Sequence, residues 1–255
     1  IDADTLDNAN ANITIQANNN ITVDEEIDLN TTGATLTLTA KNNIIVNDDI
    51  STTNGAITLT AGKDFVSTGS INSGSSSTTI VLYDGGTIGL GSAMCGGSCD
   101  MTISGSELQK ITSTGLVIGG SNTGDVYVDN VASTATQNIS GTVFIDSTNS
   151  ISFVQRASTI GKKLTLTSDG DISIEKNLTV TGNFKATADD GNLVGNFIHK
   201  AGVVLTVQGN STLKANDLNL YGVATVTGTT SLTGRVNRGG GGMLAMMAEK
   251  QKDSA

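Results

Sequence analysis

The residues with the clearest chemical potential are Cys95 and Cys99, the only two cysteines of the 255-residue chain. Three small residues separate them, so the pair could close a short disulfide loop, which export from the cell would favour. A zinc site would need further cysteines or a nearby histidine, and redox-active pairs usually have two intervening residues. The spacing therefore predicts a structural disulfide, with free thiols as the alternative.

Carboxylates and one histidine are the remaining candidates for catalysis. A serine–histidine triad needs a positioned base and an orienting acid, and no GxSxG motif accompanies the sole histidine, His199. We therefore expect His199 to be a surface residue or a side chain with its hydrogen bonds satisfied. Acidic clusters occur at Asp24–Glu26, Asp48–Asp49 and Asp189–Asp190.

A β-helical polysaccharide lyase or hydrolase would need paired carboxylates in a cleft with sugar-binding aromatics. Aromatic residues make up only 3% of the chain, and its arginines are Arg156, Arg235 and Arg238. The acidic clusters are better explained as charge that keeps the protein soluble, with a weak calcium site between the first two clusters as the alternative. We predict no catalytic, metal or cofactor-binding residue, and no enzymatic activity.

Overall charge and hydropathy restrict the partners. The net charge of −10 and the pI near 4.4 disfavour nucleic acid, whose phosphates require clustered lysine and arginine. No apolar run reaches the roughly 18 residues that span a bilayer. The sequence begins at Ile1 without a methionine or signal peptide, which indicates a processed chain or a segment of a longer one.

Internal repeats in the sequence indicate which secondary-structure elements carry the cysteines, acidic clusters and histidine described above. Three stretches align, Ile13–Ile27, Leu36–Ile50 and Ile57–Ile71, and a fourth follows at Leu164–Leu178. Each reads as a strand, a polar corner, a second strand and another corner, with asparagine, aspartate and glycine at the corners. Alternation places Leu36 and Leu38 inside and the intervening threonines outside.

A unit of this length cannot bury its own apolar face, but stacked units can. The sequence therefore predicts an all-β fold, a single right-handed parallel β-helix (β-solenoid) of roughly eleven coils, on the order of 50 Å long. The sequence lacks the signatures of three other architectures, namely leucine-rich repeats, calcium-binding nonapeptide repeats and antiparallel sandwiches. The outward threonine pairs at 37/39 and 58/60 would align on neighbouring coils, as in ice-binding arrays, but the array does not continue at Ile80–Tyr83.

The repeat phrase, LTLTA followed by a polar corner, an apolar triplet and IST, resembles the repeats of filamentous-haemagglutinin-like exoproteins. The matching segments are Leu36–Gly55, Ile57–Gly74 and Leu164–Gly182. This resemblance implies export through an outer-membrane secretion partner and a place at the cell surface or outside the cell. The family's secretion domain carries Asn-Pro-Asn motifs, and because this chain has no proline, that domain is absent from it.

The C-terminal residues differ from the repeats. Four glycines follow Arg238 and predict a flexible hinge, and the methionine-rich stretch after them has helix-forming residues without strand alternation. We therefore divide the chain into a β-helix at 1–234 and a hinge with a non-repeat tail at 235–255. The possible partner contacts in this tail are Met243, Leu244, Met246 and Met247.

Together these features predict a structural stalk or adhesin segment, a rigid rod whose loops contact proteins or glycans of a host or neighbouring cell. The alternative is a filament subunit that binds copies of itself end to end. A polysaccharide-active enzyme on the same scaffold is the less favoured class.

Overall fold

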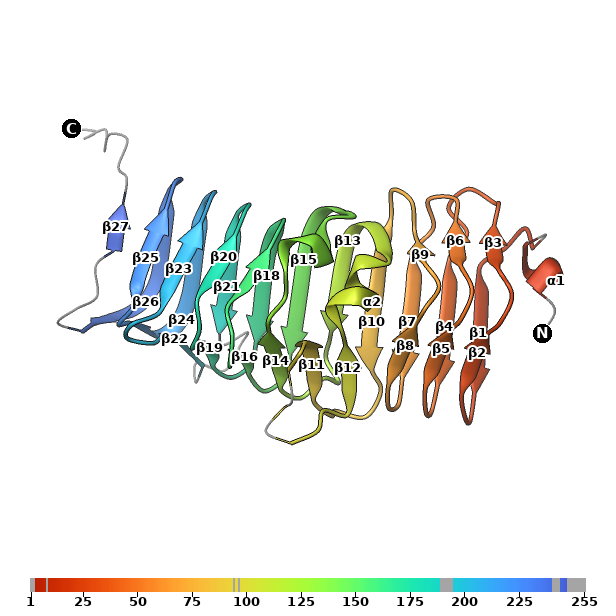
Figure 1. Ribbon diagram of the computed structural model, residues 1–255, viewed down its shortest axis with the longest axis horizontal. Coiled ribbons are helices and arrows are strands. Elements are labelled where there is room, and N and C mark those ends of the chain that lie inside the picture. Colours follow the sequence, from red (N-terminus) through yellow and green to blue (C-terminus); the bar gives the residue numbers. More distant parts are fainter. Residues whose placement is uncertain are drawn as a thin grey trace.

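The computed structural model describes residues 3–7, 9–93, 95, 97–188, 195–239 and 244–246. They wind into a β-solenoid of about ten turns, with the sequence running steadily from one end of the rod to the other (Figure 1). The predicted parallel β-helix is confirmed. Its turns number slightly fewer than predicted because one coil is enlarged: the paired residues Thr78 and Leu116 lie 38 positions apart, against 21 for Leu36 and Ile57.

Each regular coil contains three short strands, one on each of three faces. The first three coils consist of β1 (Ile13–Ala17), β2 (Ile21–Val23), β3 (Ile27–Leu29), β4 (Leu36–Ala40), β5 (Ile44–Val46), β6 (Ile50–Thr52), β7 (Ile57–Ala61), β8 (Phe65–Ser67) and β9 (Ile71–Asn72). These bounds match the strands expected from the repeats closely, because the corner residues end each strand.

Later coils follow the same plan, with some strands running round a corner from one face to the next. They are β10 (Ser77–Leu82), β11 (Ile88–Gly91), β12 (Met101–Ile103), β13 (Ile111–Gly119), β14 (Val126–Asp129), β15 (Ile139–Ser147), β16 (Ile151–Phe153), β17 (Ser158–Ile160), β18 (Lys163–Ser168), β19 (Ile172–Ile174), β20 (Leu178–Val180), β21 (Phe184–Ala188), β22 (Asn196–His199), β23 (Val204–Val207), β24 (Ser211–Leu220), β25 (Val223–Val226), β26 (Thr230–Arg238) and β27 (Leu244–Met246).

Three short helical segments interrupt the strands. Helix α1 (Ala3–Asp7) lies at the N-terminal end, where Leu6 is buried and the Asp7 carboxylate accepts a 2.7 Å hydrogen bond from the Asp28 amide. Helix α2 (Gly105–Gln109) and a 3₁₀ turn (Ser133–Thr136) lie at corners in the middle of the rod. No helix of the described residues is long and apolar enough to cross a membrane.

The core consists of side chains stacked in columns along the axis. One inward column joins equivalent positions of ten strands through direct parallel pairing, and its members are Ile15, Leu38, Leu59, Ile80, Ile118, Ile145, Leu166, Ala186, Leu213 and Leu232. Between the two ends these side chains are buried. Aliphatic side chains fill most of this narrow interior, and four phenylalanines are also fully buried, among them Phe184 and Phe197 with ring centroids 6.3 Å apart.

The outward threonines also align as predicted, since Thr37 pairs with Thr58 and Thr39 with Thr60. The column of Thr58 continues for one coil more than expected, to Thr79, whereas Val81 follows Thr60. The threonine array therefore narrows from two columns to one at β10.

Corner side chains bond each coil to the next. The Asn20 side-chain oxygen accepts from the Asn43 amide at 3.1 Å, and the Asn43 oxygen accepts from the Asp64 amide at 3.1 Å. Asp64 in turn accepts from the Thr102 amide at 2.8 Å. These corner acceptors satisfy amides that strand pairing does not reach, a role that turn propensity alone does not predict.

The C-terminal part differs from the predicted division at 234. Strand β26 runs through that boundary to Arg238, because the Asp217-to-Leu220 segment of β24 pairs in register with 235–238. Residues 244–246, expected in a non-repeat tail, form β27 and pair with β25. Leu244 and Met246 thus belong to the last coil, whereas Met243 and Met247 lie outside the described residues.

Candidate functional site

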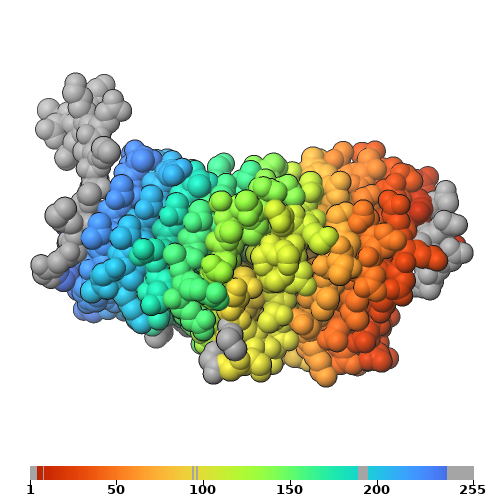
Figure 2. Space-filling model, viewed as in Figure 1, coloured from red at the N-terminus to blue at the C-terminus, as the bar shows by residue number. Residues whose placement is uncertain are grey.

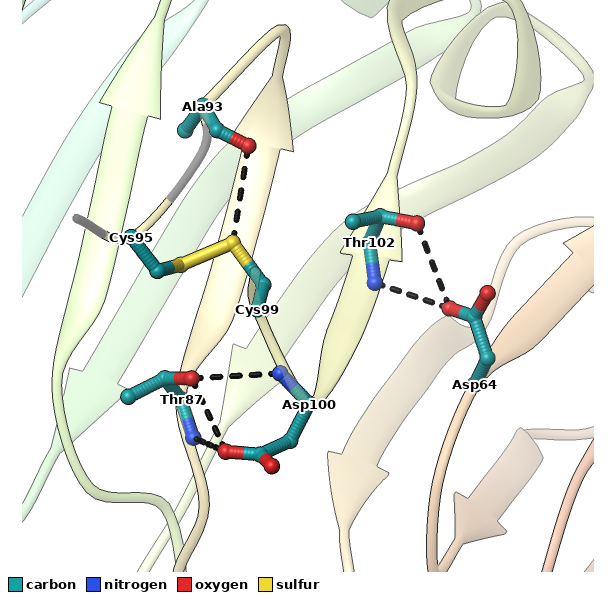
Figure 3. The surroundings of a disulfide bond; sticks show 7 residues. All are labelled: Asp64, Thr87, Ala93, Cys95, Cys99, Asp100 and Thr102. Carbon is teal, nitrogen blue, oxygen red and sulfur yellow. Dashed lines mark hydrogen bonds between the residues drawn. A yellow bond between two sulfur atoms is a disulfide. The ribbon is translucent and has the colours of Figure 1, made fainter. Parts of the chain in front are cut away.

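The least regular part of the rod surrounds the two cysteines. Strand β11 pairs with β14 on one side and with β12 on the other. The chain therefore steps back along the axis after β11 and places β12 toward β8, where Asp64 accepts from Thr102 (Figure 3). This reversal inserts an extra strand on one face, and Cys95 and Cys99 lie in the segment that makes it.

Cys95 and Cys99 are joined by a disulfide, with their Cα atoms 5.1 Å apart. The return segment passes so close to β11 that a Cβ built on Gly89 would lie 2.3 Å from the Cys99 sulfur. The Cys99 sulfur also lies 3.4 Å from the Ala93 carbonyl oxygen (Figure 3). Glycine at position 89 therefore allows the disulfide-closed segment to lie against the outer side of β11.

Thr87, which precedes β11, and Asp100, which precedes β12, bond the beginnings of these two strands to each other. The Asp100 carboxylate accepts from the Thr87 amide at 2.8 Å and from the Thr87 hydroxyl at 2.9 Å, and the Asp100 amide donates to that hydroxyl at 3.1 Å. The amide and hydroxyl donors of Thr87 lower the pKa of Asp100 because they stabilise the carboxylate form.

Glu107 connects the following helix to an earlier coil. One carboxylate oxygen accepts from the Ser104 amide at 2.8 Å, while the Ser104 hydroxyl accepts from the Glu107 amide, so the two residues form a capping box. The other oxygen accepts from the Ser67 amide of β8 at 3.1 Å. Glu107 thus holds α2 over the corner between β12 and β13.

The acidic corners form separate hydrogen bonds along the rod edge. Asn47 donates to Asp24 at 2.6 Å, and Asp49 accepts from the Ser70 amide at 2.7 Å. The Ser70 bonds lower the pKa of Asp49. In the part of the chain that the structure describes, no group of three or more histidine, cysteine, aspartate or glutamate side chains is arranged to hold a metal ion. Residues 189–190 lie outside that part.

A buried ion pair was not predicted from the sequence. The Asp129 side chain is fully buried, and it accepts from the Arg156 amide at 2.7 Å, from Nε at 3.1 Å and from Nη2 at 2.6 Å. The Arg156 side chain remains 54% exposed. Because the two residues are 27 positions apart, only the stacking of β14 under the following coil brings them together. The pair anchors a corner where Asn130 and Gln155 both have positive φ.

His199 is buried in the core of β22 with 1% of its surface exposed, so the expectation of a surface residue is wrong. Burial lowers the pKa of its imidazole by disfavouring the charged form. Its Nε2 atom lies beside Gly222, where a Cβ would be 2.4 Å away, and has no hydrogen-bond partner among the described residues. The neighbouring side chains are mainly aliphatic, among them Leu205 and Leu220.

Comparisons with known proteins found no match: no family model matches the chain, and no match was found among the curated proteins or the solved structures.

Proposed function

We propose that this chain is a rigid spacer segment of an exported surface protein, a stalk that carries adhesive loops away from the cell. The observation that carries the proposal is the unbroken inward column from Ile15 to Leu232, in which each coil pairs directly with the next. Ten coils at the ordinary strand separation give a rod of roughly 50 Å. Figure 2 shows the corresponding elongated body, in which successive sequence segments form successive bands along the axis.

Parallel pairing along the axis explains how such a rod would resist bending. The regular coils formed by β1 to β9 are attached to one another by backbone hydrogen bonds on three faces and by corner acceptors such as Asn43. Bending would have to lengthen many of these bonds at once. A solenoid of this kind therefore has a length set by the number of coils, which is the property a spacer requires.

Two further features support an exported stalk. The Cys95–Cys99 disulfide is typical of oxidising compartments, and the repeats resemble those of filamentous-haemagglutinin-like exoproteins. On this proposal the chain is exported through an outer-membrane secretion partner and functions at the cell surface. The segment closed by the disulfide, which departs from the regular coil, is the proposed contact with proteins or glycans of another cell.

The spacer role can be tested by removing one coil. Leu36 and Ile57 are register partners, so deletion of residues 36–56 joins Thr35 to Ile57 and lets β1 stack on β7. We expect a folded rod shortened by about 5 Å, measured as the maximum dimension in small-angle X-ray scattering. A matched variant lacking only 36–46 breaks the register and serves as the control. A coil deletion that unfolds the chain, or compact particles from the intact chain, would contradict the spacer role.

The adhesive role needs a separate experiment. Beads coated with the intact chain are added to cultured host cells and to neighbouring bacterial cells, and bead retention under flow is measured. Substitution of the exposed Ser98 by a bulky tryptophan alters the disulfide-closed segment, and Thr212→Trp on the outer face of β24 is the matched control. Retention lost only in the first variant supports the loop contact. Equal retention of both variants and the intact chain would refute it.

A further inference from the structure

An open groove of about 340 Å³ lies on the side of the rod, over β1 and β4. Gln16 and Thr39 belong to it and are register partners. Both alternate with the inward column of Ile15 and Leu38, so they face outward. The groove therefore opens to the side of the rod and not toward either end. Its lining residues are Gln16, Ala17, Asn18, Thr39, Lys41 and Tyr83.

Backbone pairing places Tyr83 in the same row as Lys41. The amides of Lys41, Gly62 and Tyr83 each donate to the alanine carbonyl that ends the strand one coil back, at 3.0, 2.8 and 2.8 Å. These residues therefore occupy equivalent positions on successive coils, about 4.8 Å apart. A Cβ built on Gly62 would lie only 2.0 Å from the Lys41 carbonyl oxygen. Because this position is glycine, no side chain of the row stands between Tyr83 and Lys41.

The polar side chains of the groove differ from their neighbours in having no intramolecular partner. At the same corners the Asn19 side chain accepts from Asn42, and the Asn20 side chain accepts from the Asn43 amide, so these side chains join the coils. Within the described residues, no side-chain hydrogen bond or ion pair is made by Gln16, Asn18, Thr39, Lys41 or Tyr83. Their amide, hydroxyl and ammonium groups are therefore available to a ligand.

Tyr83 adds an apolar surface to these polar groups. It is 43% exposed, whereas four of the five phenylalanines of the chain are fully buried. An aromatic ring beside unpaired donors and acceptors suits a ligand that has an apolar face and a polar rim. A pyranose ring has this character, because its C–H groups pack on an aromatic ring while its hydroxyls form hydrogen bonds.

Charge favours a sugar that carries a carboxylate. Residues 3–50 contain eight acidic residues and one cation, Lys41. The clusters Asp24–Glu26 and Asp48–Asp49 lie at a different corner, between β2 and β3 and between β5 and β6. They do not flank Lys41, which follows β4. Its ammonium can therefore pair with an acidic group of a ligand.

We propose that this groove binds an acidic pyranose, a sugar ring with a carboxylate, as a unit of a larger glycan. Tyr83 packs against one face of the ring, and Lys41 pairs with the carboxylate. Gln16, Asn18 and Thr39 form hydrogen bonds with the hydroxyls. The inference rests on the proposed adhesive role, for which it names a ligand class, and it places this contact apart from the disulfide-closed segment.

Titration with a galacturonate trisaccharide tests the proposal, and the uncharged galactose trisaccharide is the comparison ligand. Binding is followed by amide chemical shifts in nuclear magnetic resonance, which should change at the lining residues. Tyr83→Ala should weaken binding about tenfold, because a ring stacked on an aromatic side chain loses its contact. Tyr221→Ala is the matched control: it removes a tyrosine that is 38% exposed on a distant coil, and binding should be unchanged.

The carboxylate contact is tested separately. Lys41→Met should weaken binding of the acidic trisaccharide about fivefold and bring it to that of the uncharged one. Lys163→Met, which also removes an exposed lysine, should leave the preference for the acidic sugar unchanged. Ser98→Trp alters the disulfide-closed segment and should bind the acidic trisaccharide as the intact chain does.

Three results would overturn the inference. Absence of binding by the intact chain would do so and leave the spacer proposal intact, because that proposal depends on the length of the rod. Equal binding of the two trisaccharides by the intact chain would show that Lys41 recognises no carboxylate. Binding lost in Ser98→Trp but retained in Tyr83→Ala would assign the glycan to the disulfide-closed segment, which would support the adhesive role at that segment.

Discussion

The ion pair between Asp129 and Arg156 permits a prediction in which the two partners are not equivalent. Asp129 is fully buried, whereas Arg156 is 54% exposed and can return to water. Replacing Arg156 by methionine leaves a buried carboxylate with only the backbone donor at 2.7 Å. Breaking a fully buried pair costs about 3–5 kcal/mol, and the exposed arginine reduces this, so we expect a loss of about 2–3 kcal/mol in the free energy of unfolding.

Substitution of Asp129 as well as Arg156 tests whether the buried charge is the cause of this loss of stability. Asp129→Asn removes the charge and keeps an acceptor for the Arg156 amide, so the double variant should be more stable than Arg156→Met alone. Thermal unfolding followed by circular dichroism should show a Tm lowered by about 4–12 °C in the single variant, with part of that loss recovered in the double variant. A single variant as stable as the unaltered chain, or a double variant less stable than Arg156→Met, would show that the reasoning about the buried charge is wrong.

Three other predictions concern the core, the disulfide segment and the corners. Because burial lowers the pKa of His199, the unfolded chain binds a proton below about pH 6.5 that the folded chain does not. The stability should therefore decrease as the pH is lowered below about 6.5, by up to about 1.4 kcal/mol per pH unit. Denaturant unfolding at several pH values should show this slope, and His199→Leu should remove it. Gly89→Ala should destabilise by about 1–3 kcal/mol through collision with Cys99, whereas Gly97→Ala, with no atom within 4 Å of its Cβ, should have no effect on Tm; equal Tm values would contradict the close approach. Asn43→Ala should cost about 1 kcal/mol because the Asp64 amide loses its acceptor, with the exposed Asn18→Ala as control, and hydrogen exchange at Asp64 should rise only in the first variant.

The regular coils could be predicted because local pattern and tertiary contact coincide there. In β4 and β7 the alternation of leucine or isoleucine with threonine places each side chain correctly, and the next coil repeats the same choice. The strand bounds follow because asparagine, aspartate and glycine interrupt the alternation at each corner. Because the local pattern and the stacked fold favour the same strands, the structure of a regular coil can be predicted from a single sequence.

The contacts between non-equivalent positions could not be predicted. Asp129 is the polar last residue of β14, and its partner is determined only by which residue lies one coil away. His199 lies two residues after Phe197 in β22, so alternation with Phe197 was the signal that the His199 side chain points inward. The division at 234 failed for a different reason: the glycine- and methionine-rich composition after Arg238 favours a hinge and a helix locally, but backbone pairing with β24 and β25 gives strands at 235–238 and 244–246.

The disulfide and several side-chain hydrogen bonds lie in the coil whose backbone pairing with its neighbours is least regular. The coil that contains the disulfide spans 38 residues between register partners, and β12 is held by three pairs with β11. A longer excursion costs more conformational entropy to close, and of the corner acceptors named above only Asp64 bonds to it, through the Thr102 amide. The disulfide, the Asp100–Thr87 clasp and the Glu107–Ser67 bond supply the missing constraints from side chains. Such constraints fix the shape of a segment that no repeat determines, and a fixed shape is what a recognition surface on a rod requires.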